Sequence, residues 1–443
     1  MNCEQARTEI IAYLKGELSE DQKTKLEEHL ARCPACRHEL EGARRLLTWT
    51  EAASEQAIVK KVDDIIDNAI KSKASDIHFE SQRDNTLRVR YRIDGVMHDI
   101  MSIDSAERIG IVTRIKMMAD VDTSETRIPQ DGRMPWKLGS RDYNIRIAFC
   151  PFTLGEGIVM RMLDKRSPLL GLDKIYIYQD HLQTLKDLLH QPMGMFFTSG
   201  PTGSGKTTTL YSTLLELNKP EVKIMTIEDP VEIMIPGVNH SQICKKNGFT
   251  FATALRSFFR HDPDVIMIGE MRCMEDAAIS MEAAISGQMV LSQMHTNDAI
   301  GVIQRLRDMG IESYVISAAL LGAMNQRLVR RVCPDCKERV LEVNPALKML
   351  KITENDLKSH EVFKGKGCDK CHGTGYRGRA AIYELLVIDR HLREMIGEGA
   401  PCDELLQAAI SNGFMPIRED ARRKVLDGLT TAEESLRVLA LTE

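Results

Sequence analysis

One segment of the 443-residue chain has the residues of a phosphate-binding loop. Residues 200–207 match the pattern GxxxxGK[ST], between an apolar, strand-like run and a helix-length segment, and this context disfavours a flexible loop that matches by chance. Glycines let several backbone N–H groups point at one phosphate, at the positive end of the following helix. Lys206 would contact the β- and γ-phosphates, and Thr207 would ligate Mg²⁺. The predicted nucleotide-binding residues are Gly200, Pro201, Thr202, Gly203, Ser204, Gly205, Lys206, Thr207 and Thr208.

Hydrolysis of a nucleotide also needs a group that activates water, and acidic residues end two apolar segments. Glu270 ends the segment DVIMIGE and is our candidate general base. Glu228 ends the preceding apolar segment and, with Asp229 and Glu232, could help to hold Mg²⁺. Each carboxylate alone could be a solvated strand-end residue, but a shared position at the carboxyl ends of consecutive strands favours a site. His295 ends the next apolar segment and either contacts the γ-phosphate or is structural.

Eleven cysteines are present in a chain whose first residues lack the features of a secretion signal. Disulfides are therefore disfavoured, and close cysteine pairs are better interpreted as metal ligands. Two CxxC pairs with 31 residues between them predict a closed, structural zinc site formed by Cys333, Cys336, Cys368 and Cys371. A second candidate zinc site combines one histidine with three cysteines, namely Cys3, His29, Cys33 and Cys36. The alternatives are a redox role or free buried thiols for the first set and free thiols for the second.

The elements that must position these residues divide the chain into four expected domains. Residues 1–50 are expected to form a small helical unit, in which Ser19 and Gln22 have the spacing of a capping box. Residues 51–167 begin with an amphipathic helix and continue as a mixed α+β domain. Its strands are expected at 87–93, where the alternating segment ends in a tight turn, and at 141–149 and 157–163.

The third expected domain, residues 168–330, alternates short apolar runs with helix-length segments. This alternation predicts a parallel sheet covered by helices, with strands at 195–200, 222–228, 264–270 and 288–294. Residues 331–443 contain the two cysteine pairs, a glycine-rich loop at 373–378 and amphipathic helices to the end. The predicted fold class is therefore α/β, with a phosphate-loop domain between an α+β domain and a zinc-bearing C-terminal region.

Composition narrows the class of protein. Hydrophobic residues make up 43% of the chain and charged residues 28%, which is ordinary for a globular protein and excludes a disordered or fibrous one. Because no apolar run reaches about 18 residues, we expect a cytoplasmic protein that is at most peripheral to a membrane. The net charge of −5 gives no general attraction to phosphate backbones, so we expect no nucleic-acid partner.

From about residue 55 to the end, the chain resembles the secretion ATPase superfamily, in particular the type II secretion and type IV pilus assembly ATPases. The resemblance is carried by the motifs ASDIH (74–78), RVRYRIDG (88–95), RIPQDGR (127–133), SGPTGSGKTTTLY (199–211), IEDPVE (227–232), DPDVIMIGEMR (262–272), LSQMHTNDA (291–299) and GYRGRAAIYELL (375–386). One departure lies next to the site, where Cys273 replaces the acidic residue that commonly follows this arginine in the family. The departure leaves Lys206, Glu228, Glu270 and His295 in place, so we expect hydrolysis to survive, and the coupling of hydrolysis to movement is the property that the departure could alter.

The resemblance implies a RecA-like ATPase domain after a PAS-like domain, in a ring of six copies that acts on an inner-membrane platform protein. It places Glu270 as the residue that activates water, Glu228 near the metal, and His295 in the His box. It also implies that arginines of the PAS-like domain meet the phosphates, with Arg133 and one of the RVRYR set, such as Arg90, as the candidates. The four-cysteine insert favours fibre assembly or secretion over retraction. The implied cofactors are ATP, Mg²⁺ and Zn²⁺.

The N-terminal unit resembles the zinc-binding anti-sigma domains through its HxxxCxxC motif, His29 to Cys36. That resemblance covers only about 40 residues and implies a docking or regulatory unit with a partner that the sequence does not identify. Two functions therefore stay open from the sequence. One is a hexameric ATPase that powers assembly of pilin or pseudopilin fibres, and the other is a zinc-dependent binding module gated by nucleotide state.

Overall fold

The computed structural model describes residues 1–14, 16–164, 170–175 and 177–440, with the side chains at 44–54 and 245 outside the description. The chain divides into two compact units, Met1–Arg166 and Ser167–Glu443, and each is described by itself. Among the described residues, no helix combines the length and apolar character needed to cross a membrane.

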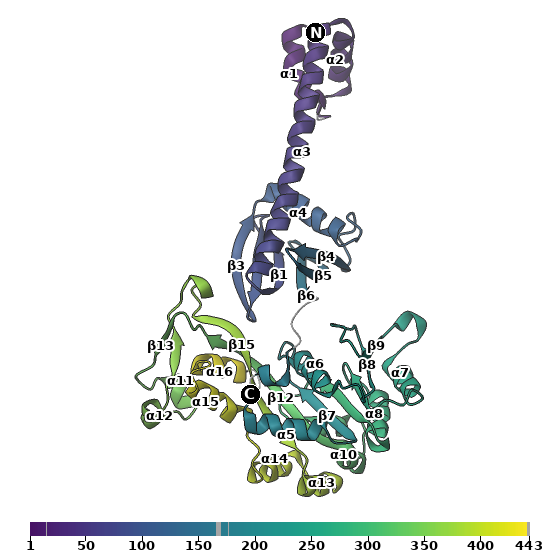
Figure 1. Ribbon diagram of the computed structural model, residues 1–443. Helices are drawn as coiled ribbons and strands as arrows, with labels where there is room; N and C mark the ends of the chain where they lie inside the picture. Colours follow the sequence, from purple (N-terminus) through teal and green to yellow (C-terminus); the bar gives the residue numbers. More distant parts are fainter. Residues whose placement is uncertain (15, 165–169, 176, 441–443) are drawn as a thin grey trace. The chain divides into compact units, whose positions relative to one another are not determined.

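The first unit begins with three helices, α1 (Cys3–Leu14), α2 (Glu20–Arg32) and α3 (Pro34–Lys71). Figure 1 shows α1 and α2 packed beside the start of the long helix α3. Ser19 caps α2 and exchanges the reciprocal bonds of a capping box with Gln22, which confirms the prediction from their spacing. Leu26 and Leu30 are buried in a small apolar cluster. Helix α3 continues as one helix through the expected domain boundary at residues 50 and 51.

A six-stranded antiparallel sheet follows in the first unit, in the order β3-β2-β1-β6-β5-β4. The strands are β1 (Ala74–Ser81), β2 (Leu87–Ile93), β3 (Val96–Ile103), β4 (Gln130–Leu138), β5 (Arg141–Phe152) and β6 (Gly155–Asp164), and α4 (Ser105–Met118) lies between β3 and β4. Strand β2 buries Leu87, Val89 and Tyr91, and its arginines lie on the other face. The three strands predicted for this region are confirmed.

The second unit is built on a seven-stranded sheet in the order β15-β12-β7-β11-β10-β8-β9. Its strands are β7 (Gly194–Ser199), β8 (Ile224–Glu228), β9 (Val238–Gln242), β10 (Val265–Ile268), β11 (Met289–Met294), β12 (Leu320–Val332) and β15 (Tyr376–Val387). The four predicted strands are confirmed as parallel neighbours. Every residue of β7 is buried, as expected for a strand covered on both faces.

Helices cover this sheet, and further helices lie in the C-terminal region (Figure 1). They are α5 (Gln179–Leu189), α6 (Lys206–Leu217), α7 (Phe251–Phe258), α8 (Met274–Ser286), α9 (Gly301–Asp308), α10 (Ser313–Ala319), α11 (Pro345–Met349), α12 (Glu354–Ser359), α13 (Arg390–Gly397), α14 (Cys402–Ser411), α15 (Ile417–Leu426) and α16 (Ala432–Leu439). A short antiparallel pair, β13 (Lys337–Arg339) and β14 (Phe363–Gly365), lies beside the C-terminal cysteines, and α11 and α12 connect its two strands.

Strand β15 corrects two expectations. It runs antiparallel to β12, so the sheet is not purely parallel. Residues 376–387, where the sequence suggested a glycine-rich loop followed by helices, are a strand. The physical reason is that 380–386 is a continuous buried stretch, and such a short and mostly apolar stretch fits a buried strand as well as a helix.

Candidate functional site

The phosphate loop joins the buried strand β7 to helix α6. Gly200, Gly203 and Gly205 have φ values of 138°, 78° and 91°, which side chains rarely permit. A Cβ at Gly200 would lie 2.4 Å from the backbone oxygen of Gln326, so a larger residue would displace the loop. The Lys206 ammonium donates to the carbonyl oxygens of Gly200 and Pro201, both at 2.8 Å. Burial lowers the pKa of Lys206 to about 8, against the opposing effect of the Glu270 carboxylate.

Three of the predicted site residues form a chain of contacts at the carboxyl edge of the sheet. The Nδ1 atom of His295 lies 3.4 Å from the Lys206 ammonium, and its Nε2 atom lies 3.5 Å from Glu270 Oε1. Because Lys206 can only donate, Nδ1 is the acceptor, which leaves the Nε2 hydrogen facing the carboxylate. The side chains of Glu270 and His295 are 24% and 47% exposed, so both can be reached from solvent. Lys206 begins α6 after the loop that follows β7, and Glu270 and His295 lie just after the ends of the neighbouring strands β10 and β11.

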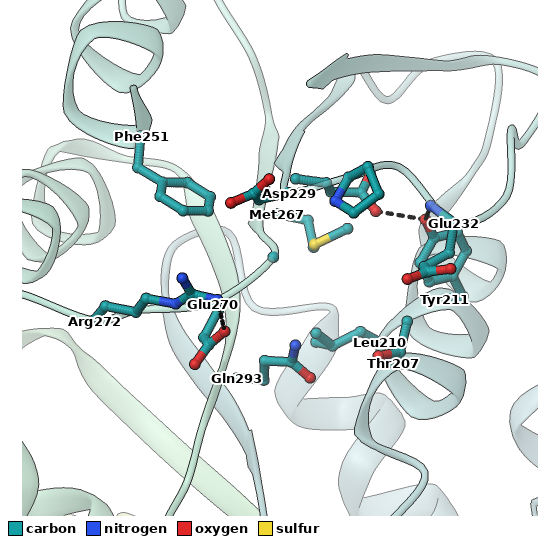
Figure 2. A pocket seen from close by; sticks show the side chains of 13 residues that line it. Thr207, Leu210, Tyr211, Asp229, Glu232, Phe251, Met267, Glu270, Arg272 and Gln293 are labelled. Carbon is teal, nitrogen blue, oxygen red and sulfur yellow. Dashed lines mark hydrogen bonds and ion pairs between the residues drawn. The ribbon is translucent and has the colours of Figure 1, made fainter. Parts of the chain in front are cut away.

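Glu270 has a further partner that the sequence analysis did not identify. The Arg272 guanidinium lies 2.6 Å from Glu270 Oε2, and Figure 2 shows the pair at one side of the pocket. The hydrogen bond to Glu270 raises the pKa of the Arg272 guanidinium, and this effect outweighs burial, which lowers the pKa. Arg272 follows Glu270 by two residues in the motif DPDVIMIGEMR, outside any helix or strand. This close spacing is the signal from which their ion pair could have been predicted.

Oxygen-bearing side chains line the same pocket and could hold a divalent cation. Thr207 lines it together with four carboxylates, Glu228, Asp229, Glu232 and Glu270. Figure 2 labels Thr207 and three of these carboxylates, Asp229, Glu232 and Glu270. Hydroxyl and carboxylate oxygens are the ligands that Mg²⁺ prefers, and it usually takes only one or two carboxylates besides the phosphates. The residues present therefore fit Mg²⁺.

Glu228 is 3% exposed and is held by three donors. The Tyr211 hydroxyl donates to Oε2 at 2.5 Å, and the Thr226 hydroxyl donates to Oε1 at 2.6 Å. His240 accepts the Ile235 N–H on Nε2, so its Nδ1 hydrogen is free to reach Glu228 Oε1 at 3.0 Å. Sequence reasoning missed this cage because its members come from α6, β8 and the polar edge strand β9.

The arginines predicted to meet phosphate lie on the sheet of the first unit. Arg90 on β2 forms an ion pair with Glu80, and Arg88 pairs with Asp99 at 2.6 Å. Arg133 is exposed on β4, opposite Arg146 in the register of β5. Contact of Arg133 and Arg90 with phosphate stays a prediction. Measuring the affinity of the Arg133→Ala and Arg90→Ala variants for ATP would test it.

The four C-terminal cysteines converge as the spacing predicted. Their sulfur atoms lie within 4.8 Å of one another, and three pairs are 3.7, 3.8 and 3.9 Å apart. Four Zn–S bonds of about 2.3 Å in a tetrahedron place sulfur atoms about 3.8 Å apart, so this set fits zinc. Burial opposes the charged form of Cys371, but N–H groups of Cys368 and Gly375 point at its sulfur and lower its pKa to about 6. A thiolate is the form that binds metal.

The N-terminal set converges in the same way. Cys3 comes from the start of α1, His29 from the last turn of α2, and Cys33 and Cys36 from the junction of α2 and α3. The four ligand atoms lie within 4.8 Å of one another, with Cys3 and Cys33 sulfurs 3.8 Å apart and His29 Nε2 3.4 Å from Cys36 Sγ. Zinc bonds of ordinary length predict about 3.8 Å and 3.5 Å for these two separations. Both sets therefore have the donors and spacing of a closed metal site.

Comparison with known proteins gives two family matches. The family described as type II/IV secretion system protein matches residues 51–437, and a zinc-finger family matches residues 3–37. The type IV pilus assembly ATPase PilB of Myxococcus xanthus is 44% identical, over 87% of this chain and 68% of its own length. Type II secretion system protein E of Pseudomonas aeruginosa is 42% identical, over 88% of this chain and 76% of its own length.

Solved structures show the same fold at lower identity. The ATPase DotB of Legionella pneumophila superposes with a TM-score of 0.63 at 19% identity, covering 85% of this chain and 95% of DotB. The pilus retraction motor PilT with bound ADP gives a TM-score of 0.55 at 23% identity, covering 84% and 95%. These likenesses show a RecA-like P-loop ATPase fold.

Proposed function

The chain belongs to the type II/IV secretion system protein family, and we propose that it hydrolyses ATP to power assembly of pilin or pseudopilin fibres, in type IV pilus biogenesis or type II protein secretion. The observation that carries the proposal is the chain of contacts from Lys206 through His295 to Glu270, at the end of the phosphate loop. The relatives named above as a pilus assembly ATPase and as a secretion system protein support the same activity.

In this proposal, Glu270 accepts a proton from the attacking water while the water oxygen forms a bond to the γ-phosphorus. The bond between that phosphorus and the bridging oxygen breaks, and the products are ADP and phosphate. Arg272 holds the carboxylate at the edge of the pocket. Lys206 and His295 lie where charge develops on the γ-phosphate oxygens and stabilise it.

Magnesium supplies charge neutralisation between the β- and γ-phosphates when it is bound. Thr207 would hold the ion through its hydroxyl, and Glu228 would supply a carboxylate near it. The cage of Tyr211, Thr226 and His240 supports this role for Glu228, because it fixes a buried carboxylate in the wall of the pocket.

The working assembly in this proposal is a ring of six copies at the cytoplasmic face of the inner membrane, where it acts on a platform protein. The proposed domains are a helical zinc unit (1–50), a PAS-like domain (51–167), the RecA-like core (168–330) and a zinc-bearing C-terminal region (331–443). Family membership supports this arrangement, and the platform protein is the partner by which the proposal would be tested in cells.

A second function is favoured by the N-terminal ligand set and by the zinc-finger match to residues 3–37. In this alternative, the zinc unit docks a regulatory partner, as the resemblance to anti-sigma domains implies, and nucleotide state gates the binding. Pull-down with the full chain and with Cys36→Ser, each with and without ATP, would detect such a partner. A partner held equally by both proteins would contradict a zinc-dependent role.

The ATPase proposal is tested by measuring phosphate release from the purified chain, with Mg²⁺ and with a chelator. We expect ATP turnover that requires Mg²⁺ and that rises when the chain is assembled into its ring. A chain that binds ATP and assembles but releases no phosphate would overturn the proposal. In cells, replacing the chain with a Lys206→Ala variant should abolish fibre assembly or secretion.

A further inference from the structure

A strip of buried polar side chains lies on β12, which pairs with the phosphate-loop strand β7, and on β15, which pairs with β12. Asn325, Gln326 and Arg327 on β12 are 0%, 1% and 2% exposed, and Glu384 on β15 is 3% exposed. Buried polar groups are costly unless they are hydrogen-bonded, so their partners indicate what they hold in place. Most of the partners of these four residues lie in or beside two loops of the candidate site, and Glu384 also accepts the N–H of Ile417 at 2.9 Å.

The first loop is the phosphate loop. The Gln326 side-chain amide donates to the Ser204 carbonyl oxygen at 2.8 Å, and its oxygen accepts the Thr209 hydroxyl at 2.8 Å. Asn325 donates to the Ser199 hydroxyl oxygen at 3.0 Å, just before the loop begins. Strand β12 therefore holds the loop before, within and after its glycines.

The second loop carries His295. The backbone oxygen of Thr296 accepts a hydrogen bond from Asn325 at 3.1 Å, and that of Asn297 accepts one from Arg327 at 2.7 Å. The N–H of Ala299 donates to Glu384 Oε1 at 2.6 Å. Three of the four residues after His295 are thus tied to the strip. Arg327 also donates to the side chain of Asn325 at 2.9 Å. This hydrogen bond links the residue that holds Asn297 to the residue that contacts both Ser199 and Thr296.

We propose that Asn325, Gln326, Arg327 and Glu384 are positioning residues for ATP hydrolysis, which hold the His295 loop at a fixed place relative to the phosphate loop. The inference rests on the proposed function, since it assumes that His295 takes part in hydrolysis. Its basis is geometric. The same buried residues hold the phosphate loop, which ends at Lys206, and the loop that begins at His295, and these two side chains lie 3.4 Å apart. A displacement of about 1 Å at such a site lowers the rate about 100-fold.

The first test replaces Arg327 by lysine. Lysine keeps the charge but loses the planar fork that reaches Asn297 and Asn325 together. We expect kcat for ATP to fall about tenfold or more, with KM within about twofold, because the Gln326 contacts to the phosphate loop remain. The matched control is Arg330→Lys on the same strand, whose guanidinium pairs with Glu434 on α16 at 2.8 Å. The control should keep the wild-type kcat, and an equal fall in both variants would overturn the proposal.

The second test is a double-mutant cycle with His295→Ala. If Arg327 acts through His295, adding Arg327→Lys to His295→Ala should lower kcat by less than about twofold. Independent, multiplied losses would overturn the positioning role and leave the ATPase proposal intact. His295→Ala with the wild-type kcat would instead overturn both the role of His295 and this inference. Should Arg327→Lys not fold, as judged by its unfolding midpoint, Asn325→Ala takes its place in the cycle and the same outcomes decide.

Discussion

Replacing Tyr211 by phenylalanine removes one hydroxyl from the centre of the Glu228 cage and leaves the ring in the core. That hydroxyl donates to Glu228 at 2.5 Å and accepts the N–H groups of Glu232 and Ile233 at 3.2 and 3.3 Å. A hydrogen bond to a charged group contributes about 1.5 to 3 kcal/mol, and a buried charge left short of a donor adds to the loss. We therefore expect the free energy of unfolding to fall by about 3 kcal/mol.

Tyr91→Phe is the matched control, because Tyr91 is also buried and its hydroxyl donates to one neutral acceptor, the Ile65 carbonyl, at 2.6 Å. We expect a loss of about 1 kcal/mol for the control. Urea unfolding followed by circular dichroism would measure both losses. Tyr211→Phe should also lower kcat for ATP, since it loosens both Glu228 and the loop at 232–233, whereas Tyr91→Phe should not. Equal losses of stability with unchanged kcat in both variants would refute the reasoning about the cage.

Two further predictions concern the metal sites and a buried carboxyl. The chain should bind two zinc ions, measured by plasma mass spectrometry, with one lost in Cys371→Ser and the other in Cys36→Ser; two ions in Cys36→Ser would contradict the N-terminal site. Burial raises the pKa of Glu384 from 4.5 to about 7, although the hydrogen bonds from the N–H groups of Ile417 and Ala299 lower it. Its stabilising contribution is therefore full below pH 4.5 and is lost as pH rises through 7. Relative to Glu384→Gln, the wild type should lose about 3 kcal/mol of stability over this range in urea titrations. A difference that does not change with pH would contradict the raised pKa.

Local signals in the sequence predicted the parts of the fold that depend on neighbouring residues. The phosphate loop at 200–207 follows from glycines at fixed offsets, and the strands around it follow from short apolar runs. The capping box of Ser19 and Gln22 could likewise be predicted, because it depends only on two residues three positions apart. The two ligand sets were also predictable, because thiols and an imidazole at close spacing have few other uses in such a chain.

Contacts between distant elements could not be predicted in this way. His240 reaches Glu228 only because the polar strand β9 pairs with β8, and nothing in its five residues alternates as a strand should. Residues 376–387 were misjudged because the glycines at their start resemble a loop, while pairing with β12 decides their conformation. Asn325 and Gln326 reach Ser199 and Ser204, which lie 126 and 122 residues earlier in the chain, through the parallel pairing of β12 with β7.

The most direct test of the central claim is the rate of ATP hydrolysis by Glu270→Gln. Glutamine keeps the size and one acceptor oxygen of Glu270, so the Arg272 contact and nucleotide binding should survive. It cannot take a proton from water, so kcat should fall at least about 100-fold while the affinity for ATP changes little. A variant that hydrolyses ATP at the wild-type rate would contradict the assignment of Glu270 and the mechanism built on it.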